Sequence, residues 1–463
     1  MNPITETTTT EVDLSTLGSA FGGDLHAPGD DGWDEARLAW NLAVDQHPAA
    51  VAIPSDAADV ARAIRFARDN GLKVSMQGTG HNAAAYEGTI GDSLMIRTDR
   101  LRDASIDPAT QTARVGAGVT WGEVVGPAAE HGLAALSGSS HDVGVVGYTL
   151  GGGVSWLARK HGLAAEHVTA FEIVSAHGDM REVTALTDPE LFWALRGGGG
   201  NFAAITAIEF RLLPITEVYA GALFFPYERA GEVLEAWRRW TANVPDEMTS
   251  IGRMIQFPPL PEVPDFLRGK SFAVVEATFI GSEERGAELL APLRELGPEM
   301  DTFATIEPQH LLALHMDPPG PVPGLGDHQM LAGLDAESLA ALVEAVGPGS
   351  DSPLLSFEFR HLGGALGRRA EGSGALGALS GKFMTFAVGM LPVPEMEAPL
   401  RGSFAAAREA LEVLDNGDSY ANFAEHRVDP ESLFGERSLN RLREIRANVD
   451  PDGLFHANHS IDA

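Results

Sequence analysis

A nucleophilic side chain ends a glycine turn at residues 78–81, which read Gly78-Thr79-Gly80-His81. Glycines permit positive φ angles and close approach of the backbone to a ligand. Successive N–H groups in such a turn form a concave site for a pyrophosphate. The turn is typical of an imidazole placed beside a phosphate-bearing cofactor, although an ordinary strand-to-loop turn produces the same pattern more often.

A second glycine cluster covers residues 138–153, where six glycines lie within sixteen positions. An amphipathic stretch with Val154, Trp156 and Leu157 follows it directly. This arrangement is typical of backbone wrapped closely around a ligand, and also of a tightly packed loop before a helix. Two such clusters in one half of the chain favour a large cofactor.

A tyrosine near the C-terminus is the second candidate for chemistry, in the segment Tyr420-Ala421-Asn422. Residues two apart point the same way in an extended segment, so Tyr420 and Asn422 are expected to face one ligand. A tyrosine takes a substrate proton if a neighbouring cation lowers its pKa from about 10. The sequence does not identify that cation, and the alternative role for Tyr420 is to anchor the C-terminal segment.

The elements around the first glycine turn are expected to hold it in place. A helix over residues 56–70, capped by Ser55 and ended by Gly71, precedes a strand over residues 72–76 that enters the turn. Further expected elements are a strand over 93–97, a helix from the capping-box spacing at 120–123 to about 131, a helix from Pro189 with Asp188 as its cap, and a strand over 204–212.

The character of the chain changes after Pro214, where glycine motifs become sparse. Strand-like runs cover residues 272–280 and 354–359, and they alternate with amphipathic helices expected at about 227–241, 283–295, 336–346 and 397–414. This pattern predicts a second domain, a sheet with helices on one face. Alternation sends Glu358 and Arg360 to one side of their strand and His361 to the other, and each is a candidate site residue.

Composition excludes several classes of function. The formal charge is −32, from 33 basic and 65 acidic residues, so nucleic acid is a poor partner. The 463-residue chain contains no cysteine, which excludes thiolate catalysis, and neither a metal-binding histidine motif nor a serine-hydrolase elbow is present. No metal site is expected. Without a run of eighteen apolar residues or a signal-peptide pattern, we expect no membrane span and a cytoplasmic location.

Taken together, the motifs resemble those of flavoproteins with the vanillyl-alcohol oxidase/p-cresol methylhydroxylase (PCMH) fold, and specifically the berberine bridge enzyme-like oxidoreductases. Ordered matches run from about residue 34 to the end of the chain. The residues that carry the resemblance are 78–81, 143–153, Trp156, 162–163, 191–202, 360–365, 420–422, 441–442 and 450–455.

The resemblance implies an α+β fold, with a two-subdomain, PCMH-type FAD-binding domain and an antiparallel-sheet substrate domain covered by helices. The expected divisions are a flexible N-terminal lead (1–19), the first part of the FAD-binding domain (20–213), the substrate-binding domain (214–414) and a C-terminal berberine-bridge-type segment that returns to the FAD domain (415–463).

The resemblance also assigns roles to residues. In such enzymes the histidine at the position of His81 bonds the 8α-methyl carbon of FAD. Many members add a second bond from a cysteine at the position of Ser140, which this cysteine-free chain cannot make. Val143 stands where the family admits O2 to the flavin. The residues expected to bind the cofactor are His81, Gly78, Thr79, Gly80, Asn82, Ser139, Ser140, Val143, Gly144, Gly147, Gly151, Gly152, Gly153, Asn201 and Asn458, with His459 as a further candidate near the ring.

The implied function is that of an FAD-dependent oxidase. Tyr420, with Asn422 beside it, is expected to accept a proton from a small alcohol, hemiacetal or amine, a compound of secondary metabolism being one option. Hydride passes to flavin N5, and O2 reoxidises the flavin and gives H2O2. The alternatives are a flavin-dependent oxygenase or oxidative cyclase, and a redox-inactive protein that binds a small molecule. The sequence specifies neither the substrate nor the oligomeric state.

Overall fold

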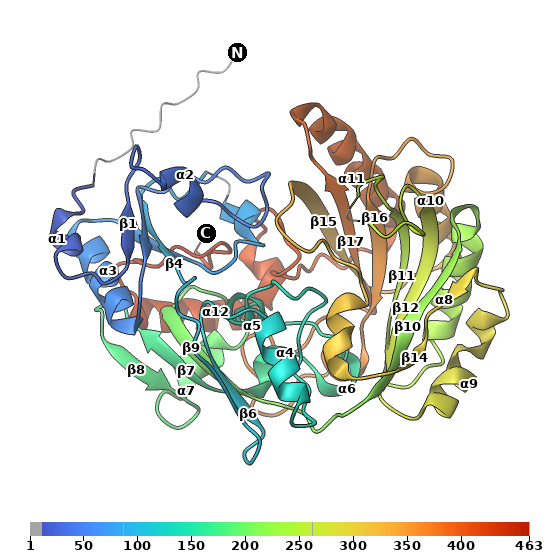
Figure 1. Ribbon diagram of the computed structural model, residues 1–463, viewed down its shortest axis with the longest axis horizontal. Coiled ribbons are helices and arrows are strands. Elements are labelled where there is room, and N and C mark those ends of the chain that lie inside the picture. The colour runs from blue at the N-terminus through green and yellow to red at the C-terminus, as the bar shows by residue number, and fades with distance from the viewer. Residues whose placement is uncertain (1–11, 87, 262, 463) are drawn as a thin grey trace.

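The fold contains three β-sheets, of four, five and eight strands (Figure 1). The computed structural model describes residues 12–86, 88–261 and 263–462. Residues 1–11 of the expected N-terminal lead lie outside these ranges. Within the described ranges, no helix combines the length and the apolar character that a membrane crossing requires.

The first glycine turn follows β3 (Lys73–Gln77), an edge strand of a four-stranded sheet with the order β1-β2-β4-β3. The strands β2 (Ala50–Ile53), β4 (Ser93–Arg97) and β3 are parallel, and β1 (Asp24–His26) is antiparallel to β2. Parallel strands need a crossover connection, and α3 (Ala57–Asp69) connects β2 to β3, which lie on either side of β4. The expected helix and strand are therefore present within a residue of their predicted bounds.

The cap of α3 differs from the expectation. Asp56, not Ser55, accepts the hydrogen bond from the N–H of Asp59, at 2.8 Å. Ser55 instead donates its hydroxyl to the carbonyl of Gly22 at 2.8 Å, a contact with a distant segment that local spacing does not indicate. The C-terminal end of α3 is as predicted, because Gly71 adopts a φ of +70° shortly after the helix.

The second sheet is antiparallel and has the order β5-β6-β9-β7-β8. Its strands are β5 (Ala104–Asp107), β6 (Thr112–Gly116), β7 (Val168–Val174), β8 (Met180–Val183) and β9 (Ala204–Arg211). The segment between β6 and β7 contains α4 (Gly122–Ala129), α5 (Val145–Leu150) and α6 (Ala158–His161), so the second glycine cluster surrounds α5. The helix α7 (Pro189–Leu195) begins as predicted, with the Asp188 carboxylate accepting the N–H of Leu191 at 3.1 Å.

The third sheet is eight-stranded and antiparallel throughout, with the order β13-β10-β12-β11-β16-β17-β15 and β14 also paired to β10. Its strands are β10 (Val218–Pro226), β11 (Met248–Gln256), β12 (Ser271–Phe279), β13 (Met300–Asp301), β14 (Ala304–Ile306), β15 (Gly324–Leu331), β16 (Ser356–His361) and β17 (Phe383–Met390). The helices α8 (Ala230–Thr241), α9 (Glu283–Arg294), α10 (Ala336–Val346) and α11 (Glu397–Leu411) lie along its outer side (Figure 1).

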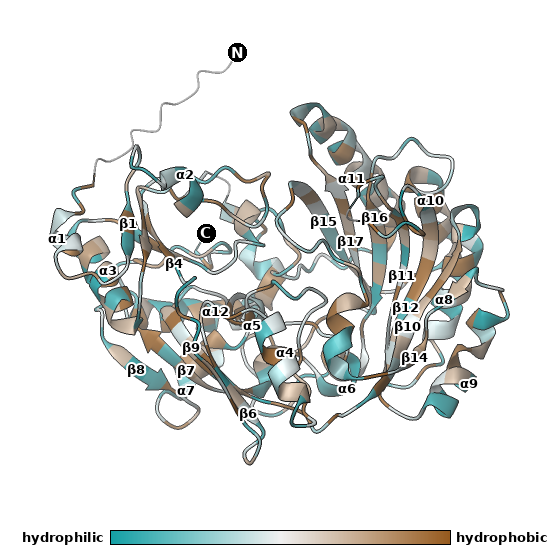
Figure 2. Ribbon diagram, viewed as in Figure 1, coloured by the Kyte–Doolittle hydropathy of each residue, from teal (hydrophilic) through white to brown (hydrophobic). Residues whose placement is uncertain are grey.

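Burial of apolar side chains explains why these helices cover one face. Trp237 of α8, Leu342 of α10 and Phe404 of α11 pack with Phe359 and Phe383 of the sheet in one core. Figure 2 shows the brown colour of hydrophobic residues along the strands of this sheet. The opposite face of β16 and β17 carries Glu358, Arg360 and Phe386, which border a cavity, so the alternation predicted for β16 is confirmed.

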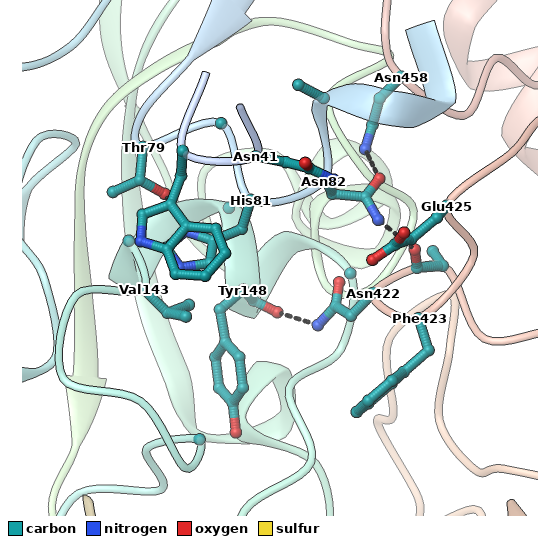
Figure 3. Close-up of a pocket in the computed structure, with 18 of the residues that line it drawn as sticks. Asn41, Thr79, His81, Asn82, Val143, Tyr148, Asn422, Phe423, Glu425 and Asn458 are labelled. Atoms are coloured by element: carbon teal, nitrogen blue, oxygen red, sulfur yellow. Dashed lines mark hydrogen bonds between the residues drawn. The ribbon is translucent and has the colours of Figure 1, made fainter. Parts of the chain in front are cut away.

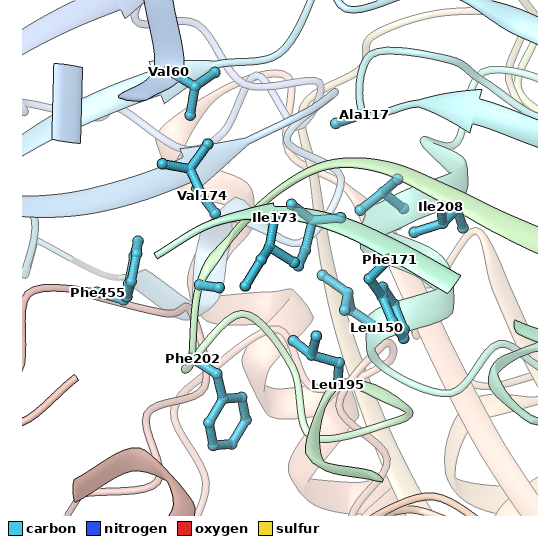
Figure 4. Packing of buried hydrophobic residues seen from close by; sticks show 14 of the residues in the cluster. Val60, Ala117, Leu150, Phe171, Ile173, Val174, Leu195, Phe202, Ile208 and Phe455 are labelled. Carbon is cyan, nitrogen blue, oxygen red and sulfur yellow. The ribbon is translucent and has the colours of Figure 1, made fainter. Parts of the chain in front are cut away.

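The C-terminal segment packs against the first sheet. After α12 (Pro430–Val449), Leu454 and Phe455 join the core formed by residues such as Val60 and Phe171 (Figure 4). The N–H of Val74 in β3 donates to the carbonyl of Leu454, and the N–H of His456 donates to the carbonyl of Val74, both at 2.8 Å. The chain end therefore lies beside the strand that leads into the glycine turn.

These features confirm the expected α+β fold, with an antiparallel sheet covered by helices in the middle of the chain. The divisions at residues 213/214 and 414/415 stay predictions. They fall close to the start of β10 and just after α11.

Candidate active site

A cavity of about 470 Å³ lies between the glycine loops and the uncovered face of the third sheet. Its wall combines the turn at residues 78–82, the second glycine cluster, the inner face of β16 and β17, and residues 420–425 with 456–459 of the C-terminal segment (Figure 3). Segments from all parts of the sequence therefore meet at one site.

His81 is held on three sides. Its Nδ1 lies 2.6 Å from the Thr79 hydroxyl, and the Trp40 indole stacks on the ring with centroids 4.2 Å apart and planes inclined by 19°. Its Nε2 lies 3.4 Å from a carboxylate oxygen of Asp142, is buried, and makes no hydrogen bond among the described residues. Gly80 adopts a φ of +85°, and a Cβ there would approach the Cα of Ala39 to 2.9 Å, so glycine is required at this turn.

Asp142 is a site residue that the sequence reasoning missed. Its carboxylate accepts hydrogen bonds from the Ser140 hydroxyl at 2.6 Å and from the Trp40 indole N–H at 2.5 Å. Burial raises the pKa of Asp142, but the contact with His81 and the hydrogen bonds from Ser140 and Trp40 outweigh burial and hold that pKa well below its ordinary value. The group is therefore a carboxylate next to a histidine.

The second glycine cluster serves two purposes. Gly147 has no atom within 4 Å of the place where a Cβ would stand, and it borders the cavity, which leaves its backbone open to a ligand. A Cβ on Gly151 would stand 1.8 Å from the Asn422 amide oxygen. Gly153 adopts a φ of +79°, and a Cβ there would approach the Tyr148 ring to 2.5 Å. The cluster thus opens the cavity and also admits the C-terminal segment.

Tyr420 and Asn422 meet at this cluster. The Tyr420 side chain is 1% exposed, and its hydroxyl oxygen accepts hydrogen bonds from the N–H of Gly153 and the Asn422 amide, both at 3.0 Å. The same amide donates to the Tyr148 carbonyl at 2.9 Å. Burial raises the pKa of Tyr420 well above its ordinary value, whereas these donors and the charge of Arg360 act in the opposite direction. Tyr420 and Asn422 therefore meet as predicted, but not for the predicted reason: the segment is a turn, in which the Tyr420 carbonyl accepts the N–H groups of Phe423 and Ala424, and not an extended strand.

A buried ionic network forms the sheet side of the cavity. His315 lies between two carboxylates, with Nδ1 at 2.6 Å from Glu276 and Nε2 at 2.9 Å from Glu358. Arg253 contacts Glu276 at 2.8 Å, and Nε of Arg360 donates to Glu358 at 2.6 Å. Burial lowers the pKa of His315, but Glu276 and Glu358 outweigh burial and raise it to about 9. His315 is therefore a cation at neutral pH.

Arg360 presents the rest of its guanidinium to the cavity. The group lies over the Phe423 ring, 4.7 Å from its centroid, and Nε is its only nitrogen with a hydrogen bond to the residues that the structure describes. Its charge acts on both Tyr420 and Tyr148. Arg360 is thus the cation near Tyr420 that the sequence alone did not identify.

Glu425 is a further carboxyl group on the cavity wall (Figure 3). It packs on Gly326 of β15, where a Cβ would approach the carboxyl carbon to 2.7 Å. Burial raises the pKa of Glu425 to about 7, while a hydrogen bond from the Gly326 backbone acts in the opposite direction. It lies five positions after Tyr420, a spacing that gave no signal of its own.

Most residues predicted to bind the cofactor border the cavity. They are Gly78, Thr79, Gly80, His81, Asn82, Ser139, Ser140, Val143, Gly144, Gly147, Gly151 and Asn458, together with His459. The Asn458 amide donates to the Asn82 carbonyl oxygen at 2.5 Å, and Asn82 donates in turn to the backbone carbonyl of Ala424 at 3.1 Å. These contacts connect the glycine turn to the C-terminal segment.

Three residues predicted to bind the cofactor, Gly152, Gly153 and Asn201, do not border the cavity. Asn201 is fully buried, donates to the His459 carbonyl at 3.0 Å and accepts from the Arg446 side chain at 3.1 Å, so it anchors the chain end. Gly152 and Gly153 pack against the Tyr420 and Tyr148 rings behind the wall. Positive φ angles at both glycines explain their residue type without a ligand.

His361 lies on the other side of β16, as the alternation predicts. Its ring stacks on Phe383 with centroids 5.7 Å apart, and burial lowers its pKa to about 3. It does not border the main cavity.

The residues present fit an FAD. Glycine backbone at residues 78, 80, 144, 147 and 197–200 borders the cavity, and such backbone approaches a pyrophosphate closely. The His81 imidazole borders the same cavity. Apolar side chains such as Val143, Val146 and Leu150 border the same space and suit a planar ring system.

Comparisons with known proteins agree with this fit. A family model described as FAD binding domain matches residues 48–184, and one described as berberine and berberine like matches residues 419–462. The (R)-6-hydroxynicotine oxidase of Paenarthrobacter nicotinovorans is 32% identical over 265 residues, which cover 57% of this chain and 53% of that protein. The match thus spans about half the length of that relative.

Two solved structures illustrate the similarity of fold. The wild-type BBE-like 1 protein of Physcomitrella patens has a TM-score of 0.84 at 21% identity, over 97% of this chain and 99% of that chain. A glucooligosaccharide oxidase from Acremonium strictum, described with a 6-S-cysteinyl, 8α-N1-histidyl FAD, has a TM-score of 0.80 at 22% identity, over 96% of this chain and 98% of that chain.

The two family matches lie on the segments that build the cavity, the glycine-rich N-terminal part and the Tyr420 segment. In these two segments the chain is therefore similar to berberine bridge enzyme-like FAD-linked oxidoreductases, and it shares the fold of the solved BBE-like structure.

Proposed function

We propose that this protein is an FAD-dependent oxidase of a small organic substrate that bears an alcohol, hemiacetal or amine group. The observation that carries the proposal is the convergence of His81, the Tyr420–Asn422 pair and the ionic network of Arg360 on one cavity. When bound, FAD accepts a hydride from the substrate carbon and passes the electrons to O2, which leaves as H2O2.

Tyr420 serves as the proton acceptor. Its hydroxyl oxygen receives N–H donors from Gly153 and Asn422, and such donors stabilise the charge that develops on oxygen when a proton leaves. Arg360 adds a positive charge nearby. Burial opposes ionisation of Tyr420, so the base depends on these donors and on Arg360 for its activity.

The ionic network positions Arg360. Glu358 holds Nε of Arg360 from one side, and Glu358 is itself held by His315 at 2.9 Å. Buried ion pairs are tolerated where additional partners satisfy each member. The N–H groups of Arg360 that make no hydrogen bond to the described residues are then available to the substrate or to Tyr420.

His81 is the proposed covalent tether of FAD, and it is the only one because the chain has no cysteine. Ser140, at the position where relatives carry the second link, instead donates its hydroxyl to Asp142. Val143 borders the cavity and is the proposed point of access for O2. A cytoplasmic location also remains a proposal.

The first test is a screen for peroxide release in air. The names of the relatives suggest which substrates to test. They are the two enantiomers of 6-hydroxynicotine, together with gluco-oligosaccharides and xylo-oligosaccharides. We expect H2O2 in equal amount to the oxidised substrate. Label from 18O2 in the organic product would favour the oxygenase or cyclase alternative, and oxidation that proceeds only with an artificial electron acceptor would contradict the oxidase.

The second test concerns the tether. Acid precipitation of the purified protein should leave the yellow colour with the chain, whereas His81→Ala should release all of its FAD. Complete release from the unmutated protein would refute the covalent bond without affecting the oxidase proposal.

A further inference from the structure

The proposed function leaves the half-buried carboxylate of Asp142 unused. Asp142 is oriented by two donors, the Ser140 hydroxyl at 2.6 Å and the Trp40 indole at 2.5 Å, and its remaining contact is Nε2 of His81 at 3.4 Å. Trp40 also stacks on the His81 ring, so one side chain fixes both partners. The carboxylate and the imidazole are therefore held in register, with side-chain exposures of only 20% and 22%.

The two ring nitrogens of His81 have different surroundings. A carboxylate beside Nε2 favours the tautomer that carries its proton there. Nδ1 then keeps its lone pair, and its partner is the rotatable hydroxyl of Thr79 at 2.6 Å. This is the arrangement by which a carboxylate makes the opposite nitrogen of an imidazole a better nucleophile.

We propose that Asp142 is the proton acceptor that enables His81 to form its covalent bond with FAD. The inference rests on the proposed tether and extends it to a residue that acts through the histidine. It also explains why serine suits position 140: the hydroxyl holds Asp142 in place, a contact that a thiol would make only weakly.

Nδ1 of His81 bonds the 8α carbon of FAD, and the Nε2 proton passes to Asp142, which keeps the alkylated imidazole neutral. The 8α carbon loses one hydrogen as a proton, and two electrons leave through the flavin ring to O2. With the two protons, O2 becomes H2O2. While the imidazole is positively charged, the contact with Asp142 becomes a charge-assisted hydrogen bond, which is shorter than the present 3.4 Å.

The test uses the full-length holoprotein and measures the fraction of its FAD that stays with the chain after acid precipitation. Asp142→Asn keeps an oxygen that accepts the Trp40 N–H but removes the charge. We expect tether formation to slow by roughly 100-fold or more, the usual contribution of a positioned base. Total FAD per chain should stay unchanged, because Asp142→Asn leaves the glycine backbone intact. Asp265→Asn, the same change at a side chain that is 90% exposed, is the matched control and should remain tethered.

Chemical rescue separates proton transfer from simple positioning. In Asp142→Ala, added formate should restore tether formation during incubation in air, and chloride at the same ionic strength should not. Asp142→Glu should restore it in part. Equal retention of FAD in Asp142→Asn and the unmutated protein would overturn the inference and leave the tether standing. Release from the unmutated protein would overturn both, while peroxide production remains an independent test of the oxidase.

Discussion

The ionic network on the third sheet should make stability depend on pH in a defined window. His315 is paired with Glu276 at 2.6 Å and with Glu358 at 2.9 Å, and its pKa is raised from 6.5 to about 9. A folded-state pKa above the unfolded value means that the folded protein binds the proton more tightly. The stabilisation is therefore fully present below pH 6.5 and is lost as the pH rises through 9.

The magnitude follows from the shift. At about 1.4 kcal/mol per pKa unit, the change at His315 corresponds to about 3 kcal/mol of unfolding free energy. Substitution His315→Gln removes the titrating group and leaves two carboxylates without their shared cation. We expect a destabilised variant whose deficit relative to the unmutated protein is largest below pH 6.5 and shrinks by about 3 kcal/mol as the pH rises past 9.

The assay is urea unfolding followed by pulse proteolysis at several pH values from 6 to 10, on both proteins. Glu276→Gln provides a second arm, because loss of the carboxylate that most raises the pKa of His315 should move the window to lower pH. Glu288→Gln on α9, whose side chain is 66% exposed, is the control for a surface carboxylate. Parallel curves for His315→Gln and the unmutated protein across this range would refute the reasoning.

Three further predictions address the cavity. Tyr420→Phe should slow anaerobic reduction of the bound FAD by roughly 10²–10⁴-fold, with FAD content retained, and a loss smaller than tenfold would exclude Tyr420 as the base. It should also cost about 1–3 kcal/mol of stability, measured by urea unfolding, because the buried Gly153 N–H loses its acceptor. Gly151→Ala should displace Asn422, because the new Cβ would stand 1.8 Å from the Asn422 amide oxygen. The content of FAD per chain, measured by absorbance, should then fall. An unchanged FAD content would contradict the placement of FAD in this cavity. Glu425→Gln should gain about 1–3 kcal/mol relative to the unmutated protein as the pH rises from 4.5 through 7, because the raised pKa makes ionised Glu425 unfavourable; a pH-independent difference in unfolding would show otherwise.

Elements with local signals were predictable. The helices α9 and α10 begin beside Ser282 and Asp335, whose side chains accept the N–H groups of Arg285 and Ser338. Capping residues and amphipathic spacing act within one or two turns, so the sequence reveals them. The Ser55 cap failed because a contact with Gly22, over thirty residues away, captured its hydroxyl.

In the candidate site, too, local patterns were predictable and contacts between distant segments were not. The spacing of residues indicated the glycine turn with His81 and the alternation along β16, whereas the Tyr420–Asn422 pair meets in a turn that the spacing did not predict. Asp142 was not foreseen because its partners His81 and Trp40 come from other segments, Trp40 being 102 positions away. The His315 network was missed for the same reason, since His315 and Glu276 are 39 positions apart in the chain.

The sequence by itself determined the residue types at the site: the glycines that admit a ligand, the histidine nucleophile, the tyrosine and the absence of cysteine. Tertiary structure decided which charges act on them. It placed Asp142 beside His81, Arg360 near Tyr420, and Glu276 and Glu358 around His315. The physical reason is that electrostatic and hydrogen-bonding effects depend on distance and burial in space, which chain separation does not encode.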